Sequence, residues 1–169
     1  MLIIMAGLPG AGKTAIARVL ATRLQAVHIR IDTIEQALLS SGTLNRPLGE
    51  VGYIVGYRLA EDQLRLGLGV VADSVNPLEI TRDAWLAVPA RASVRAIEVE
   101  VTCSDPVEHR RRLETREADI PGLQLPTWDE VVARTYEPWS REHIVIDTGG
   151  RTIGRCVEQL LDRTREDAP

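Results

Sequence analysis

The sequence of 169 residues has no phenylalanine and only one lysine, although it has nineteen arginines. Without phenylalanine, the core has to be filled mainly by leucine, valine, isoleucine and alanine. There are only two cysteines, Cys103 and Cys156, and their separation matches no metal-ligand spacing. We expect both to be small buried side chains in a protein from a reducing compartment.

Long apolar runs are also missing, since no stretch approaches the roughly 20 residues needed to span a membrane. The apolar start is short and has no basic segment before it, so we expect no signal peptide. The net charge of −4 gives no general attraction to nucleic acid or to anionic membranes. We therefore expect a single cytoplasmic domain over residues 1–169, without membrane or nucleic-acid partners. These features leave the oligomeric state open.

The one lysine lies in a glycine-rich octet that matches the phosphate-loop pattern G-x-x-x-x-G-K-[ST] at every fixed position. The octet reads Gly7-Leu8-Pro9-Gly10-Ala11-Gly12-Lys13-Thr14. Glycines let the backbone wrap closely round a phosphate chain, at the mouth of a helix whose dipole favours anions. Lys13 would supply a point charge to the β- and γ-phosphates, and the Thr14 hydroxyl a ligand for Mg²⁺. The octet predicts a nucleotide site.

Short apolar runs alternate with helical patterns along the whole chain. The runs predict strands at Leu2–Ala6, Val27–Ile31, Val70–Ala72, Ala96–Thr102 and His143–Ile146. The helical patterns cover Thr14–Leu24, Thr33–Ser40, Val51–Leu66, Ile80–Ala92, Val107–Arg116, Trp128–Tyr136 and Ile153–Arg163. This alternation predicts an α/β fold with a parallel sheet, whose ligands bind beyond the carboxyl ends of the strands.

Three acidic residues, Asp32, Asp73 and Asp147, follow predicted strands at the edge where ligands are expected to bind. Asp73 ends an apolar strand and is predicted to hold Mg²⁺ opposite Thr14, with a turn or helix cap as the alternative. Asp32 follows the second strand and could orient an acceptor hydroxyl and take its proton. The alternative for Asp32 is that it caps the helix expected to begin at Thr33.

Arginines crowd the end of the helix over 107–116, next to a segment with two prolines and a glycine. Arg112 and Arg116 are four residues apart and so are expected on one helix face. We predict a lid over roughly residues 110–128, with closing arginines that stabilise transition-state charge. Weaker candidates for substrate contact are Tyr53, Arg58, Asn76 and Arg82. For Tyr53, packing in the core is the alternative. His28 is assigned no chemical role.

Together these motifs resemble those of small P-loop kinases of the adenylate-kinase-like superfamily. More narrowly, the chain is similar to bacterial kinases grouped with gluconate kinase, chloramphenicol phosphotransferase and zeta toxins. The resemblance implies a three-layer fold with a five-stranded parallel sheet in the order 2-3-1-4-5 and a helical lid. It also implies ATP and Mg²⁺ as cofactors and Asp32 as the general base. It places Arg112 near adenine, Arg116 near phosphate, and the turn that contains Thr148 beside the purine.

Some features of related proteins are missing, and their absence narrows the function. The D-G-x-P-R turn of nucleoside monophosphate kinases is replaced by Asp73-Ser74-Val75-Asn76-Pro77, which disfavours a nucleotide acceptor. The guanine motif N-K-x-D cannot occur, because Lys13 is the only lysine. We predict an ATP- and Mg²⁺-dependent kinase for a hydroxyl of a small molecule. The alternatives are a kinase acting on RNA or tRNA, and a regulatory or toxin-like ATPase.

Overall fold

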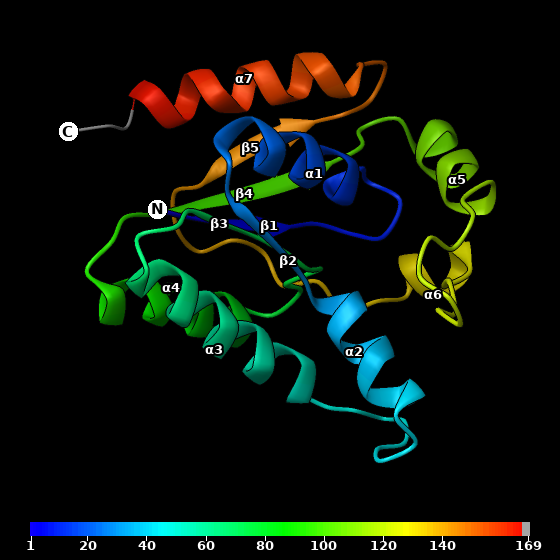
Figure 1. Ribbon diagram of the computed structural model, residues 1–169. Helices are drawn as coiled ribbons and strands as arrows, with labels where there is room; N and C mark the ends of the chain where they lie inside the picture. The colour runs from blue at the N-terminus through cyan, green and yellow to red at the C-terminus, as the bar shows by residue number, and fades with distance from the viewer. Residues whose placement is uncertain (167–169) are drawn as a thin grey trace.

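The computed structural model describes residues 1–166 and contains a five-stranded, all-parallel sheet (Figure 1). The strands lie in the order β2-β3-β1-β4-β5, which confirms the predicted topology. Their bounds are Leu2–Ala6 for β1, Val27–Arg30 for β2, Val70–Asp73 for β3, Ala96–Thr102 for β4 and Ile144–Asp147 for β5. Parallel strands of this kind need crossover connections, which the helices supply.

Helices cover both faces of the sheet, as Figure 1 shows. One face carries α1 (Lys13–Leu24) and α7 (Ile153–Glu166), and the other carries α3 (Val51–Arg65) and α4 (Glu79–Ala92). Three shorter helices lie toward the carboxyl ends of the strands, namely α2 (Ile31–Ser40), α5 (Pro106–Glu114) and α6 (Trp128–Val132). Within residues 1–166, none of the helices is long and apolar enough to span a membrane.

Each face of the sheet has its own hydrophobic core, because side chains alternate along β1. Ile3 and Met5 pack toward α1 and α7, whereas Leu2 and Ile4 pack toward α3 and α4. Trp85 is the largest fully buried side chain and supplies the aromatic bulk of the second core. Of the two cysteines, Cys156 is buried as predicted and Cys103 is only partly buried.

Three helices end earlier than predicted, α3 by one residue, α5 by two and α6 by four, and tertiary contacts explain the difference in α6. The α6 helix has a capping box between Thr127 and Glu130 but ends at Val132. The chain after it is drawn toward α4, where the Glu137 amide donates to the Pro77 carbonyl oxygen at 2.8 Å. The α5 helix ends at Glu114, so Arg116 is not helical and does not share a helix face with Arg112.

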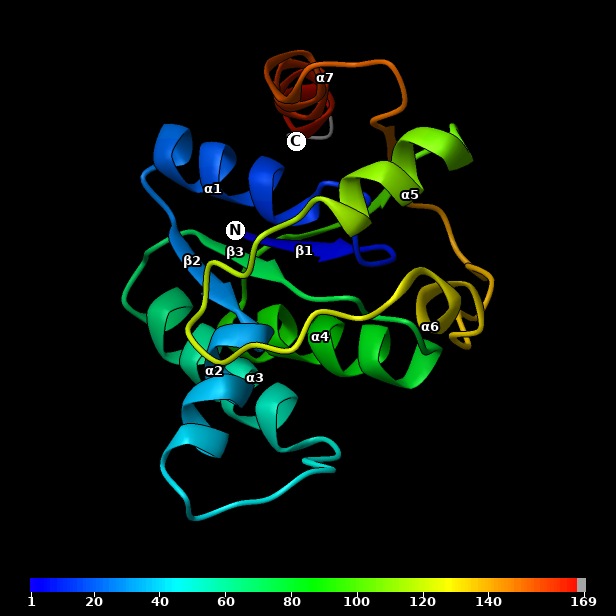
Figure 2. The same cartoon turned by 90° about the vertical axis from the view of Figure 1, so that its right-hand side faces the viewer.

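Residues 115–127 join α5 to α6 and are called the connecting segment below. Figure 2 shows this segment crossing in front of the sheet, past β2 and α2, at the side where the strands end. It occupies the place of the predicted lid. The phosphate loop, the end of β2 and the connecting segment therefore meet at one edge of the sheet.

Candidate active site

The phosphate loop follows β1 directly and has the backbone that its glycines predict. Gly7 has φ +131°, and a Cβ there would lie 2.1 Å from the Val101 carbonyl oxygen. Gly12 has φ +102° and is the N-cap residue of α1. Only glycine combines these dihedrals with so close an approach to a neighbouring strand. The loop therefore starts α1 with its amide groups at the helix N-terminus, which is a binding site for anions.

Three carbonyl oxygens of the loop are held by side chains. The Lys13 ammonium donates to Leu8, the His109 ring bonds Pro9, and the Thr148 hydroxyl bonds Ala11, at 3.0, 2.8 and 2.8 Å. Oxygens engaged in this way are kept from a bound anion, and the amide N–H groups remain to bind phosphate. Two of these supporting side chains, His109 and Thr148, come from segments about 100 residues or more away in the sequence.

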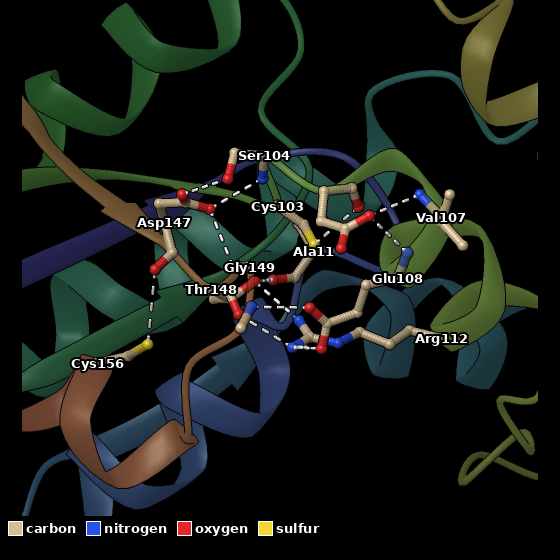
Figure 3. Close-up of polar contacts among 12 residues, drawn as sticks. Ala11, Cys103, Ser104, Val107, Glu108, Arg112, Asp147, Thr148, Gly149 and Cys156 are labelled. Carbon is tan, nitrogen blue, oxygen red and sulfur yellow. Dashed lines mark hydrogen bonds and ion pairs between the residues drawn. The ribbon is translucent and has the colours of Figure 1, made fainter.

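Thr148 lies beneath the loop (Figure 3) and has no exposed surface. Its hydroxyl also lies 2.9 Å from the Thr102 carbonyl oxygen, and Arg112 donates to its side chain and its carbonyl oxygen at 2.8 and 3.0 Å. Arg112 is further paired with Glu108 at 2.6 Å. The buried side chain of Thr148 joins the phosphate loop to Arg112, and the position of its turn beside the purine stays a prediction.

Lys13 is buried, with 7% of its surface exposed. Burial lowers the pKa of its ammonium group from 10.5 to about 8, and the carboxylates of Asp73 and Asp32 offset only part of this effect. The nearby charges of Arg116 and Arg134 lower the pKa further. Lys13, Arg116 and Arg134 therefore repel one another at this site, and a bound phosphate chain would reduce that repulsion.

Thr14 and Asp73, the two residues predicted to hold Mg²⁺, are neighbours in the structure. The Thr14 hydroxyl hydrogen-bonds the Asp73 carboxylate, whose side chain is 3% exposed. Burial would raise the pKa of Asp73, but the hydrogen bond from His28 and the charge of Lys13 outweigh it, so the pKa is lowered. An ionised carboxylate beside a hydroxyl oxygen fits Mg²⁺, which is bound by one or two carboxylates together with substrate phosphates. Within residues 1–166, no three His, Cys, Asp or Glu side chains cluster as an all-protein metal site would.

Two cavities open on either side of the phosphate loop. The first, of about 390 Å³, is lined by the phosphate loop, the start of α1, Arg112 and the connecting segment, including Asp119. The second, of about 460 Å³, is lined by residues of α2, the turn after β3 and the connecting segment. Three residues, Lys13, Thr14 and Arg116, line both cavities. A group bound at these three residues would be accessible from both cavities.

Asp32 lines the second cavity, on the first turn of α2. The helix begins at Ile31 rather than at Thr33, and its N-cap residue is Arg30 without a side-chain cap. Asp32 is therefore not the helix cap that was the alternative from the sequence. Its side chain is 41% exposed and lies 3.2 Å from the guanidinium of Arg30.

Tyr53 also lines the second cavity, whereas the other three weaker candidates do not. Asn76 is fully buried, and its side-chain amide donates to the Met5 carbonyl oxygen at 2.9 Å. Arg82 is 1% exposed and donates to the carbonyl oxygens of Glu137 and Pro138 at 3.1 and 3.2 Å. We therefore correct both assignments to structural roles.

Arg58, the third of these candidates, points into solvent. Its side chain is 73% exposed and lies 3.5 Å from the carboxylate of Glu61, which is also paired with Arg65 and Arg91. Arg58 shares α3 with Tyr53, but the two residues differ by five positions and so occupy different faces of the helix. The substrate assignment of Arg58 is corrected accordingly.

Two further residues at the site, Glu35 and Arg134, were not selected from the sequence. Glu35 lies one turn after Asp32 and lines the second cavity together with Arg134 and Arg46. Burial and the charge of Asp32 raise the pKa of Glu35. Gly52 makes room for it, since a Cβ there would lie 2.4 Å from the Glu35 Cγ. The spacing of Asp32 and Glu35 on one helix was a usable signal for Glu35; no comparable signal marked Arg134.

His28 was given no role, but its Nε2 lies 3.3 Å from Oδ2 of Asp73. The register of β2 and β3 explains the contact. His28 is opposite Val71 and Arg30 is opposite Asp73, so His28 and Asp73 are diagonal neighbours across the two strands. The sequence contains no direct record of this register.

The sheet order, the phosphate loop and the paired Thr14 and Asp73 define a P-loop kinase fold. The chain matches the AAA domain family over residues 2–138. It therefore belongs to this family of P-loop proteins. No curated protein sequence matches the chain significantly.

Solved structures with the same fold include three proteins of low sequence identity. The APS kinase CysC of Mycobacterium tuberculosis, in complex with AMPPNP and APS, is 17% identical with a TM-score of 0.69, covering 97% of this chain and 96% of that chain. Kti12 of Chaetomium thermophilum, in complex with ADP-AlF3, is 21% identical with a TM-score of 0.71, covering 98% of each chain. A gluconokinase of Sinorhizobium meliloti 1021 is 15% identical with a TM-score of 0.63, covering 99% of this chain and 97% of that chain.

Proposed function

We propose that the protein is an ATP- and Mg²⁺-dependent kinase that transfers the γ-phosphoryl group to a hydroxyl of a small molecule. The observation that carries this proposal is the pair of cavities that share Lys13, Thr14 and Arg116. Phosphoryl transfer needs a nucleotide and an acceptor on opposite sides of one phosphate position. Asp32 lies on the acceptor side of that position.

The residues suggest how the transfer would proceed. Asp32 accepts the proton of the acceptor hydroxyl while that oxygen forms a bond to the γ-phosphorus of ATP. The bond from this phosphorus to the β–γ bridging oxygen breaks, and its electron pair leaves with ADP. Lys13 and Arg116 neutralise the charge on the transferring group. Thr14 and Asp73 would hold Mg²⁺, which when bound would supply further charge neutralisation on the phosphates.

The second cavity supports a small acceptor. Its volume of about 460 Å³ lies within the roughly 300–1,000 Å³ usual for small-molecule pockets. Its walls combine charged groups with apolar side chains from the turn after β3, the start of α4 and the connecting segment. These apolar residues are Val75, Pro77, Leu78, Ile80, Leu123, Leu125 and Pro126. A molecule with both polar groups and an apolar face suits such a lining.

The test is ADP production with a panel of sugars, aminoglycosides, phenicols, nucleosides and RNA. For the acceptor that stimulates turnover, Asp32→Asn should lower kcat by roughly 10²–10⁴-fold while ATP still binds. Asp62→Asn, at an exposed position of α3, is the matched control and should behave as the wild type. Unchanged turnover in Asp32→Asn would show that Asp32 is not the base.

The same panel distinguishes the alternative functions. Stimulation by RNA alone would replace the small-molecule acceptor with a macromolecular one. Slow ATP hydrolysis that no acceptor stimulates would favour a regulatory ATPase, because a switch of that kind needs no acceptor carboxylate.

A further inference from the structure

Arg30, the last residue of β2, connects the acceptor carboxylate to the connecting segment. Its guanidinium is 4% exposed and lies between two carboxylates from different parts of the chain. One amino group donates to Asp119 of the connecting segment at 2.8 Å, and the other donates to Asp32 at 3.2 Å. Neither contact follows from the phosphate loop or from the proposed metal site.

Asp119 is the residue that fastens the connecting segment to the body of the protein. Besides Arg30, it is paired with Arg18 of α1, and its Oδ1 lies 3.9 Å from Arg116. The hydrogen bond from Arg30 is the main cause that lowers the pKa of Asp119 to about 2. Figure 2 shows that the segment passes close to β2 on its way to α6. One carboxylate thus docks the segment on two core elements.

The shared guanidinium makes the two contacts interdependent. Arginine stays charged at any pH that the protein meets, and a buried charge without a partner is costly. When Asp119 leaves, Asp32 is the hydrogen-bonded carboxylate that Arg30 keeps, while Asp73 acts on it only through charge at longer range, and Asp32 is drawn into a full ion pair. When Asp119 is docked, it carries most of the pairing, and Asp32 keeps an oxygen free for the cavity.

We propose that Arg30 is a positioning residue that couples docking of the connecting segment to the availability of Asp32 for the acceptor. This inference rests on the proposed function, because it takes Asp32 as the group that contacts the acceptor hydroxyl. The segment also carries Arg116, which lines both cavities. Docking therefore brings Arg116 to the phosphate position and releases Asp32 in one movement. An open segment would leave the site without its arginine and with its base engaged.

Thermodynamic coupling is reciprocal, so a change at Asp32 must alter the docking equilibrium of the connecting segment. In Asp32→Asn, Asp119 is the carboxylate that still hydrogen-bonds Arg30, with Asp73 contributing only its charge, and the segment should dock more tightly. Hydrogen exchange of the amides between residues 117 and 126, measured on the full chain without nucleotide or acceptor, should slow by about fivefold. In Asp119→Asn the same amides should exchange faster by about tenfold, since a hydrogen bond to a charged group is lost.

The double variant and a control complete the experiment. Asp32→Asn should have no effect on exchange once Asp119→Asn is present, because the shared partner no longer links them. Glu114→Gln removes a negative charge from an exposed ion pair on the neighbouring helix and should leave the segment unchanged. If Asp119→Asn speeds exchange but Asp32→Asn does not slow it, Asp119 is a simple latch and the coupling is refuted. If neither variant changes exchange, the docking itself is refuted. Because the experiment measures hydrogen exchange and not turnover, its results can be interpreted even if the protein proves not to be a kinase.

Discussion

Lys13 is expected to lower the free energy of unfolding of the protein, although it contributes to nucleotide binding. The drop of its pKa from 10.5 to about 8 corresponds to about 3 kcal/mol of unfavourable burial of the charged form. This figure already includes the favourable effects of Asp73 and Asp32. Replacing Lys13 with methionine removes this penalty and also the hydrogen bond to Leu8, which is worth about 1 kcal/mol. We therefore expect Lys13→Met to be more stable at pH 7 by about 2 kcal/mol, or about 4–8 °C in Tm.

The effect should depend on pH in a defined direction. Between about pH 8 and 10.5 the folded Lys13 loses its proton while the unfolded chain keeps it, so wild-type stability rises relative to the variant. Below pH 8 the difference between the two proteins stays constant, and it shrinks as the pH rises through this window. Urea unfolding at pH 7, 8.5 and 9.5 measures the difference in stability between the two proteins. Taking the difference cancels the contributions of other titrating groups, which are the same in both proteins.

A matched control separates burial from loss of charge. Arg110→Met removes a positive charge from an exposed ion pair with Glu114 and should change stability by less than about 0.5 kcal/mol. Lys13→Met should also weaken ATP binding by about 10–100-fold, the usual loss for a charge-assisted hydrogen bond. A variant less stable than wild type at pH 7, or a difference independent of pH up to 9.5, would refute the reasoning.

Two further predictions concern the supports of the site. His28→Phe removes the hydrogen bond to Asp73. It should raise by about tenfold the Mg²⁺ concentration needed for half-maximal binding of a fluorescent ADP analogue, and His28→Gln should recover part of this loss. Equal Mg²⁺ requirements in the wild type and both variants would contradict this role. Gly7→Ala combines positive φ with a backbone clash at Val101 and should lower the free energy of unfolding by more than about 3 kcal/mol. Gly42→Ala, which has positive φ but no neighbour within 4 Å, should cost only about 1–2 kcal/mol in the same urea titration, and equal losses would refute the clash.

Local patterns predicted the phosphate loop and the proximity of Asp73 to Thr14, whereas Mg²⁺ binding by this pair stays a prediction. The octet from Gly7 to Thr14 specifies its own backbone through glycine, so its conformation depends little on the rest of the chain. Asp73 could be found because it ends an apolar strand, and strand ends meet at one edge of a parallel sheet. The strand order followed from the family resemblance.

Side-chain direction beyond the strand ends could not be predicted in the same way. Asn76 and Arg82 are close in sequence to Asp73, yet both turn into the protein because partners from β1 and from the chain after α6 hold them there. Arg116 was expected on a helix, but α5 ends two residues before it. Position in sequence gives proximity to a site, and packing decides which side chains enter it.

The sequence by itself therefore determined that a phosphate loop lies beside a carboxylate at the end of a parallel sheet. That information is local, since a few neighbouring residues set the backbone and supply the charges. Only the tertiary structure decided that His28 supports Asp73, that Thr148 lies beneath the loop, and that Arg30 joins Asp32 to Asp119. These contacts join residues up to 137 positions apart, and they depend on strand register and on the path of the connecting segment.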